Sequence, residues 1–339
     1  MSAALPPLRH PPVRPDWLAR RTETALEPEL PIIDAHHHLR NRADDVYLAA
    51  DFLADAAQGH DIRASVAVEC MAHFLPDGDP LFRPVGETFF LCDQGAGTRV
   101  AAAIVGYADL TAGAAIRPVL EAHVAAGQGR FRGIRQIATH HPDPAARGST
   151  GSPPPGLLLD PAFRAGFSQL APLGLSFEAW LYHTQLAELR DLADAFPDTR
   201  IVLNHVGGAL GIGPYAQRGR HVRAAWSAAL RELSHCPNLS IKLGGMGMRL
   251  FGFGFHEQDD PPGSQQLAEA WRPLTEICVE AFGAERCMFE SNFPVDKGAC
   301  GYVPLWNAFK RISRGWTPAE RAAAFHDTAA RFYRIEGLG

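Results

Sequence analysis

The segment Pro31–Leu39, PIIDAHHHL, places an acid and three consecutive histidines directly after a short apolar run. If that run is a β-strand, side chains alternate between its faces, so His36 and His38 share one face and His37 takes the other. Two imidazoles on a rigid strand end can hold a divalent metal ion or bind a substrate oxygen. The alternative is a run of solvated histidines on the surface. Histidines at the ends of other strands would argue against that alternative.

Two later segments also place a histidine after an apolar run. His183 ends the sequence EAWLYH, and His205 lies in LNHVGG, just after IVLN. A lone histidine of this kind is usually structural. Three such positions at the ends of separate strands favour one shared site, provided that the strand ends meet.

Apolar and β-branched runs recur along the chain, and helical patterns separate them. We expect strands at about 31–36, 62–70, 99–106, 131–137, 174–180, 200–206, 238–244 and 286–291, and helices that include 189–196, 222–233 and 267–282. Nearly continuous apolar strands that alternate with helices indicate a parallel sheet covered by helices. Eight such units fit a closed (β/α)8 TIM barrel. A doubly wound sheet is the competitor, but no G-x-G-x-x-G follows the first strand.

The chain reads as a single barrel domain at 31–339 after a proline-rich N-terminal arm at 1–30, which is expected to pack on a neighbour or stay mobile. Long segments at 138–160 and 245–266 follow strands at the carboxyl-terminal face, where barrel enzymes keep their active sites. The second contains Phe251, Phe253 and Phe255, which we expect to cap the mouth or to form a dimer contact.

Composition excludes several classes of protein. The net charge is −5, which gives no reason to expect nucleic acid or an anionic membrane as a partner. No apolar run approaches the ~20 residues of a membrane helix, none near the N-terminus has signal-peptide length, and the six cysteines show no C-x-x-C spacing. A cytoplasmic protein with a small-molecule substrate is expected, and a homo-oligomer is left open.

The motifs and their order along the chain resemble those of the amidohydrolase superfamily. Within it, they resemble the amidohydrolase-related (amidohydrolase 2) branch, which includes lactonases and nonoxidative decarboxylases. The resemblance covers about residues 30–335 and rests on DAHHH at 34–38, GIRQ at 133–136, WLYHTQL at 180–186, LNHVGG at 203–208, IKLGG at 241–245 and MFESNFPVD at 288–296. It is strongest to the lactonase-type group, which hydrolyses cyclic esters of sugar acids or of aromatic breakdown products.

The resemblance implies roles for particular residues. His36 and His38 match the first-strand pair that binds metal or substrate, and His183 lies near a further position of that kind. His205 matches a histidine that contacts the metal, the nucleophilic water or the substrate carbonyl. Arg135 matches a position that often contacts a substrate carboxylate, for which a planar guanidinium is well suited.

The last strand departs from the family pattern. The family has an aspartate that activates water, whereas this chain has Asn292, and a neutral amide cannot take a proton near neutral pH. Glu290 on the same face is the favoured replacement, Asp296 in the following loop is a second, and a catalytically altered relative is a third. Asn292 remains a candidate catalytic residue beside Glu290 and His205. Glu178 and Trp180, on the fifth strand, and Asp296 are expected to contact the substrate.

The predicted fourth strand, FRGIRQI, contains no lysine, which argues against the carboxylated-lysine bridge of binuclear family members. No metal or one divalent ion, zinc or manganese, is therefore expected. The leading hypothesis is a hydrolase of a small, carboxylate-bearing lactone or related cyclic ester. The alternatives are a metal-dependent nonoxidative decarboxylase or hydratase of an aromatic acid, and a non-catalytic relative that keeps the pocket.

Overall fold

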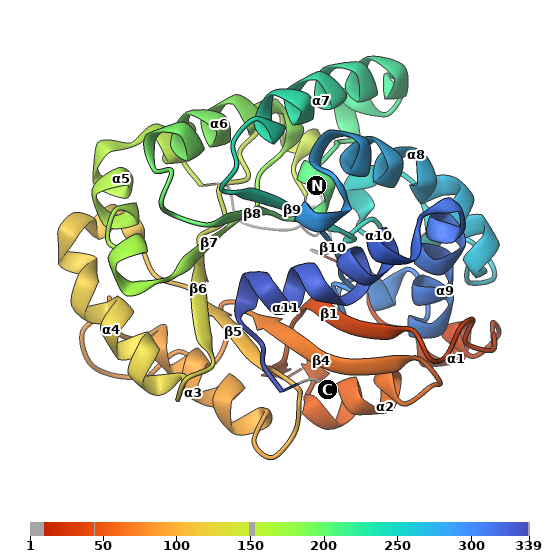
Figure 1. The fold of residues 1–339 in the computed structure, drawn as a ribbon, viewed down its shortest axis with the longest axis horizontal. Helices are drawn as coiled ribbons and strands as arrows, with labels where there is room; N and C mark the ends of the chain where they lie inside the picture. Colours follow the sequence, from red (N-terminus) through yellow and green to blue (C-terminus); the bar gives the residue numbers. More distant parts are fainter. Residues whose placement is uncertain (1–9, 44, 149–152, 338–339) are drawn as a thin grey trace, which may run out of the picture.

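The computed structural model describes residues 10–43, 45–148 and 153–337. Within these ranges, eight parallel strands follow one another around a ring surrounded by helices, which is the (β/α)8 TIM barrel expected from the sequence (Figure 1). Every predicted strand range overlaps one of them. In ring order they are β1 Pro31–His37, β4 Asp61–Val68, β5 Ala103–Gly106, β6 Phe131–Arg135, β7 Ser176–Ala179, β8 Ile201–Leu203, β9 Leu239–Leu243 and β10 Cys287–Phe289.

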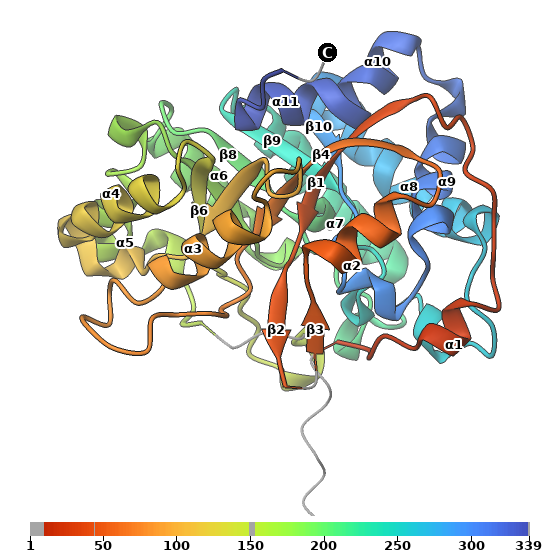
Figure 2. The ribbon, with the colours of Figure 1, turned by 90° about the horizontal axis from the view of Figure 1, so that it is seen from below.

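Most of the helices surround the ring, and the last two lie at one end of it (Figure 2). The helices are α1 Pro15–Leu18, α2 Ala49–Ala56, α3 Val85–Gln94, α4 Arg117–Ala126, α5 Pro161–Phe167, α6 Leu186–Ala195, α7 Gly219–Ser234, α8 Ser264–Phe282, α9 Tyr302–Ile312, α10 Pro318–Ala322 and α11 Thr328–Tyr333. The helical pattern at 189–196 overlaps α6, and those at 222–233 and 267–282 fall within α7 and α8. Across the described ranges, none of the helices is long and apolar enough to span a bilayer.

The ring closes between its first and last strands. The amide of His38 donates to the carbonyl of Phe293 at 2.7 Å, and the amide of Asn292 donates to the carbonyl of His36 at 2.8 Å. His37 and Phe293 form a parallel bridge. These bonds hold the histidine run beside residues 290–292, although more than 250 residues of chain separate them.

Two hydrophobic layers stabilise the barrel. The larger lies between the strands and the helices, and the smaller fills the ring itself. The inner layer includes Val66, Val105, Val202 and Met288 from four strands, and Tyr333 of α11 packs against them. Figure 2 shows α10 and α11 at one end of the molecule, opposite the end that carries β2 and β3.

The open end carries a hairpin that the sequence pattern does not predict. Strands β2 Arg40–Arg42 and β3 Asp45–Tyr47 pair antiparallel directly after β1 (Figure 2). Each has three residues and a mixed polar composition, too short for an alternating pattern to be recognised. The hairpin therefore extends the mouth at the carboxyl-terminal end of the strands.

The described part of the N-terminal arm, residues 10–30, packs on the same chain; residues 1–9 lie outside the description. The indole Nε1 of the buried Trp17 contacts the carbonyl oxygens of Gln258 and Asp259 at 3.1 and 2.9 Å. Phe251 and Phe255 of the same loop are buried in the hydrophobic core. Neither ring is exposed, and neither is among the described residues that line the cavity at the mouth.

Candidate active site

The end of β1 carries the histidine pair into the barrel. The Nε2 atoms of His36 and His38 lie 3.2 Å apart. His38 Nδ1 lies 2.8 Å from the carbonyl oxygen of Val68, which can only accept, so Nδ1 donates and Nε2 is left as an acceptor. His37 points the other way and stacks on Phe52 of α2, with ring centroids 4.2 Å apart. The alternation inferred from the sequence places these rings correctly.

The turn after β8 presents His205. Its φ is 52° and that of Val206 is 47°, a left-handed backbone that non-glycine residues seldom adopt and that tends to occur at functional sites. Two glycines after β9 make room for the side chains. A Cβ at Gly245 would lie 2.4 Å from His205 Nδ1, and one at Gly244 would lie 2.4 Å from Glu290 Cγ. Larger residues at either position would displace this pair.

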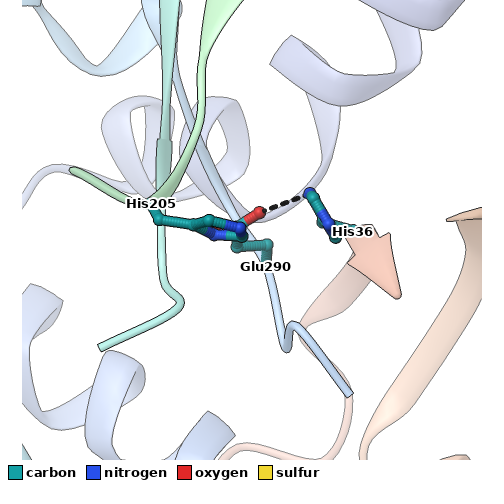
Figure 3. A group of neighbouring side chains, drawn as sticks. All are labelled: His36, His205 and Glu290. Carbon is teal, nitrogen blue, oxygen red and sulfur yellow. Dashed lines mark hydrogen bonds and ion pairs between the residues drawn. The ribbon is translucent and has the colours of Figure 1, made fainter. Parts of the chain in front are cut away.

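Glu290 follows β10 and joins two of the imidazoles. One carboxylate oxygen lies 2.6 Å from His205 Nδ1, and the other lies 3.1 Å from His36 Nδ1 (Figure 3). The side chain is fully buried, and it is not among the described residues that line the cavity. Burial raises the pKa of Glu290 to about 8, although the Lys242 ammonium opposes the shift. The carboxylate thus lies behind His205 and does not line the cavity.

The three imidazoles of the cluster are uncharged bases at neutral pH. Burial lowers the pKa of His36, His38 and His205 well below the ordinary histidine value. Nearby cations act in the same direction, because a positive charge disfavours protonation of a neighbouring ring. Among these cations, Lys242 lowers the pKa of His36 most, and Arg135 lowers the pKa of His38 and of His205 most.

Arg135, at the end of β6, lines the cavity and forms a buried ion pair with Glu69. Its Nε donates to the Glu69 side chain at 2.6 Å, and its Nη2 donates to the Glu69 carbonyl at 2.6 Å. Its Nη1 lies 3.3 Å from His36 Nε2. The guanidinium is therefore fixed in orientation, and its remaining N–H groups are available to an anionic ligand.

Lys242 of β9 lies fully buried beneath the histidines. Its ammonium donates to both carboxylate oxygens of Glu178, at 2.9 and 2.7 Å, and lies 3.2 Å from His36 Nδ1. Asn204 and Tyr333 also donate to Glu178. Burial lowers the pKa of Lys242, and the Glu178 carboxylate opposes that shift. Glu178 was predicted to contact substrate, but these bonds commit it to the interior below the cavity.

A cavity of about 1220 Å³ opens at the mouth of the barrel. Among the described residues, its inner wall includes five that sequence analysis singled out: His38, Arg135, Trp180, His205 and Asn292. The outer wall comes from arm residues 10–13, the β2–β3 hairpin and segment 294–297. The indole of Trp180 stands edge-on to His205, with ring centroids 4.7 Å apart.

His183 lies away from this cluster. Its Nδ1 accepts a hydrogen bond from the amide of Leu210 at 3.3 Å, and its ring packs edge-on against Tyr215. It is absent from the described cavity lining, and the structure does not bring it to His36 and His38 as the predicted metal role requires. The strand β7 ends at Ala179, so His183 belongs to the following turn, where strand alternation no longer sets its direction.

Asp296 is buried behind the cavity wall instead of covering the mouth. It accepts from Asn292 Nδ2 at 2.9 Å and from the amide of Gly247 at 2.8 Å. Burial raises its pKa to about 8. The predicted substrate contact is therefore not made, since Asp296 orients the Asn292 amide, which lines the cavity itself.

One group among the described residues has the donors for a metal ion. Ligand atoms of His36, His205 and Glu290 lie within 4.8 Å of one another. The neighbouring charges oppose an ion there. Lys242 faces Nδ1 of His36 and Arg135 faces Nε2, at 3.2 and 3.3 Å. Cation–cation repulsion is weakly screened in a buried site, so both charges lower the affinity of these donor atoms for a divalent ion.

The sequence pattern did not reveal the roles of Lys242 or of the glycine pair. Lys242 sits inside the apolar strand LSIKL, and a lone charge in such a strand was the available signal for a buried ion pair. The doubled glycine in IKLGG was the signal for close approach of another side chain. Neither pattern identifies which residue fills the space.

Comparison with known proteins places the fold and site in context. The family model described as "Amidohydrolase" (Amidohydro_2) matches residues 33–335. An uncharacterised protein of Sinorhizobium fredii, y4mH, is 38% identical over 291 residues, which cover 85% of this chain and 86% of that protein. An L-fucono-1,5-lactonase of Burkholderia multivorans is 27% identical over 318 residues, which cover 89% of this chain and 96% of the lactonase.

A similar solved structure is an amidohydrolase from Burkholderia multivorans. It is 26% identical, with a TM-score of 0.70 in its HEPES-bound crystal form, and the match covers 90% of this chain and 99% of that protein. A second crystal form of that amidohydrolase contains zinc. The similarity extends over the barrel that presents the histidines.

Proposed function

This chain belongs to the amidohydrolase family, and from that premise we propose that it hydrolyses a small, carboxylate-bearing lactone or related cyclic ester. One observation carries the proposal: His205 lines the cavity, and its Nδ1 lies 2.6 Å from the buried carboxylate of Glu290. The lactonase of Burkholderia multivorans, 27% identical, supports a lactone as the substrate, and Arg135 in the cavity wall supports the carboxylate on it.

His205 is the general base in this proposal, and Glu290 acts through it. With Nδ1–H donated to the Glu290 carboxylate, Nε2 holds a lone pair that can take a proton from water. The hydroxide attacks the lactone carbonyl and forms a C–O bond. The ring C–O bond then breaks, and the proton on His205 passes to the leaving alkoxide. Sequence analysis assigned water activation to Glu290 itself.

Two further residues orient the substrate. Arg135 binds the carboxylate through N–H groups not used by Glu69, because a fixed guanidinium matches a planar anion. Asn292 uses one amide N–H on Asp296, and we assign its other N–H to the carbonyl oxygen of the lactone. His38 does not serve as a donor, because its N–H is committed to Val68.

The substrate class is tested with 1,4- and 1,5-lactones of sugar acids and with pyrone carboxylates, each followed by acid release in a pH-stat. Turnover of a carboxylate-bearing lactone is expected to exceed that of the matched neutral lactone. No ring opening, together with carbon dioxide release from an aromatic acid that requires added zinc or manganese, supports the decarboxylase alternative. Tight ligand binding without any turnover supports a non-catalytic relative.

The catalytic rate is expected to rise with pH and level off above about pH 8, the value to which burial raises the pKa of Glu290. When Glu290 is protonated, its proton faces His205 Nδ1, so the ring carries its own proton on Nε2 and cannot accept another. Loss of one proton from the pair restores the base. Measurement of kcat from about pH 6 to about pH 9.5, corrected for spontaneous hydrolysis, tests this. A rate that falls across this range contradicts it.

A further inference from the structure

Lys242 is a buried cation at the centre of the barrel. The side chain has no exposed surface, which is rare for lysine unless a carboxylate pairs with it. Glu178 supplies that carboxylate and contacts the ammonium through both oxygens. Asn204 and Tyr333 complete the hydrogen bonds of Glu178. The ion pair is therefore built into the fold from β7, β9, α11 and the residue that follows β8.

The same ammonium reaches the candidate metal group. It lies 3.2 Å from His36 Nδ1, the nitrogen that is also 3.1 Å from Glu290. The other ring nitrogen of His36 faces Arg135 at 3.3 Å. Both edges of this imidazole are thus occupied by cationic groups, on the sides where a metal ion would have to bind.

We propose that Lys242 takes the electrostatic place of a metal ion in this site and keeps divalent cations from binding at His36, His205 and Glu290. A strongly hydrated ion would have to displace the ammonium or share its space, and repulsion between like charges at such distances is large in a buried site. Removal of the ammonium opens that side of His36. The inference rests on charge and geometry and does not depend on lactone hydrolysis.

The test is zinc binding by isothermal titration with zinc chloride, checked by metal analysis after dialysis. Wild-type protein is expected to retain well under one equivalent. Lys242→Met is expected to bind about one equivalent with a dissociation constant lower by about tenfold or more. Equal affinity in the two proteins, or tight stoichiometric binding by wild type, overturns the proposal.

Two further variants isolate the cause. Lys242→Met frees Glu178, which lies 3.9 Å from His36 Nδ1 and could itself bind zinc. The double variant Lys242→Met/Glu178→Gln removes that ligand and also avoids an unpaired buried charge. The gain in zinc affinity over wild type is expected to persist in this double variant. A gain confined to the single variant means that the freed carboxylate is responsible and overturns the proposal.

Lys310→Met is the matched control. Lys310 is also a buried lysine beside a histidine, 3.0 Å from His60 Nδ1, but it lies among arm carbonyls outside the active site. Its zinc affinity is expected to equal that of wild type, and an equal gain there overturns a specific role for Lys242. If the Lys242 variants fail to fold, stoichiometric zinc that survives dialysis of wild type still overturns the proposal. That measurement stands even if no lactone is a substrate.

Discussion

Replacement of Glu290 by glutamine lowers kcat by about 10²–10⁴-fold, the range over which a positioned general base contributes to catalysis. The amide cannot carry the negative charge that stabilises a protonated His205, and its NH2 can hold the ring in the wrong tautomer. The volume is conserved and the site is fully buried, so the fold is expected to persist. Steady-state kinetics on the best lactone, with thermal unfolding measured in parallel, checks this.

Glu87→Gln is the control for that experiment. Glu87 is another fully buried acid whose pKa burial raises to about 8, but it accepts hydrogen bonds from the amides of Cys70 and Ala72 and not from His205. Its activity is expected to stay within about twofold of wild type, since it does not contact the proposed base. Wild-type activity in Glu290→Gln would remove the dyad from the mechanism.

Replacement of Arg135 by methionine is expected to lower the free energy of unfolding by about 3–5 kcal/mol, because it leaves the Glu69 carboxylate buried without its cation. Urea unfolding curves measure the change. The double variant Arg135→Met/Glu69→Gln is expected to lose less, since neither charge remains. A loss within about 1 kcal/mol in the single variant contradicts a structural role for the pair.

The same substitution separates stability from recognition. In Arg135→Met, KM for a carboxylate-bearing lactone is expected to rise about tenfold or more above the rise for a matched neutral lactone, because one charge-assisted contact is lost. Equal effects on both substrates would assign Arg135 to the fold alone.

The barrel could be predicted from the sequence because each strand is a short apolar run between helices. The same reasoning placed His36 and His38 inside and His37 outside, since alternation in β1 depends only on local backbone. It failed for His183, which lies beyond the end of its strand. The partners of Glu178 were also beyond reach, because strand register and the position of Tyr333 follow from the closed ring.

The position of Glu290 relative to the cavity could not be predicted from the sequence either. Its type and strand suggested an acid at the site, but its depth behind His205 depends on the left-handed turn after β8 and on the room left by Gly244 and Gly245. Those features arise from three strands together. Residue type thus predicted that Glu290 and His205 belong to one site. Which of the two lines the cavity depends on how the strands pack in the closed barrel.

The hydrogen bond from Tyr333 to Glu178 has a consequence for synthesis of the protein. Tyr333 follows His36 by almost 300 residues in the sequence, so it leaves the ribosome much later. The carboxylate that holds Lys242 gains all of its hydrogen bonds only after the chain has been made beyond the last barrel strand, β10. Nascent chains that stop short of this tyrosine are therefore expected to have an unfinished catalytic centre, even where most strands have already formed.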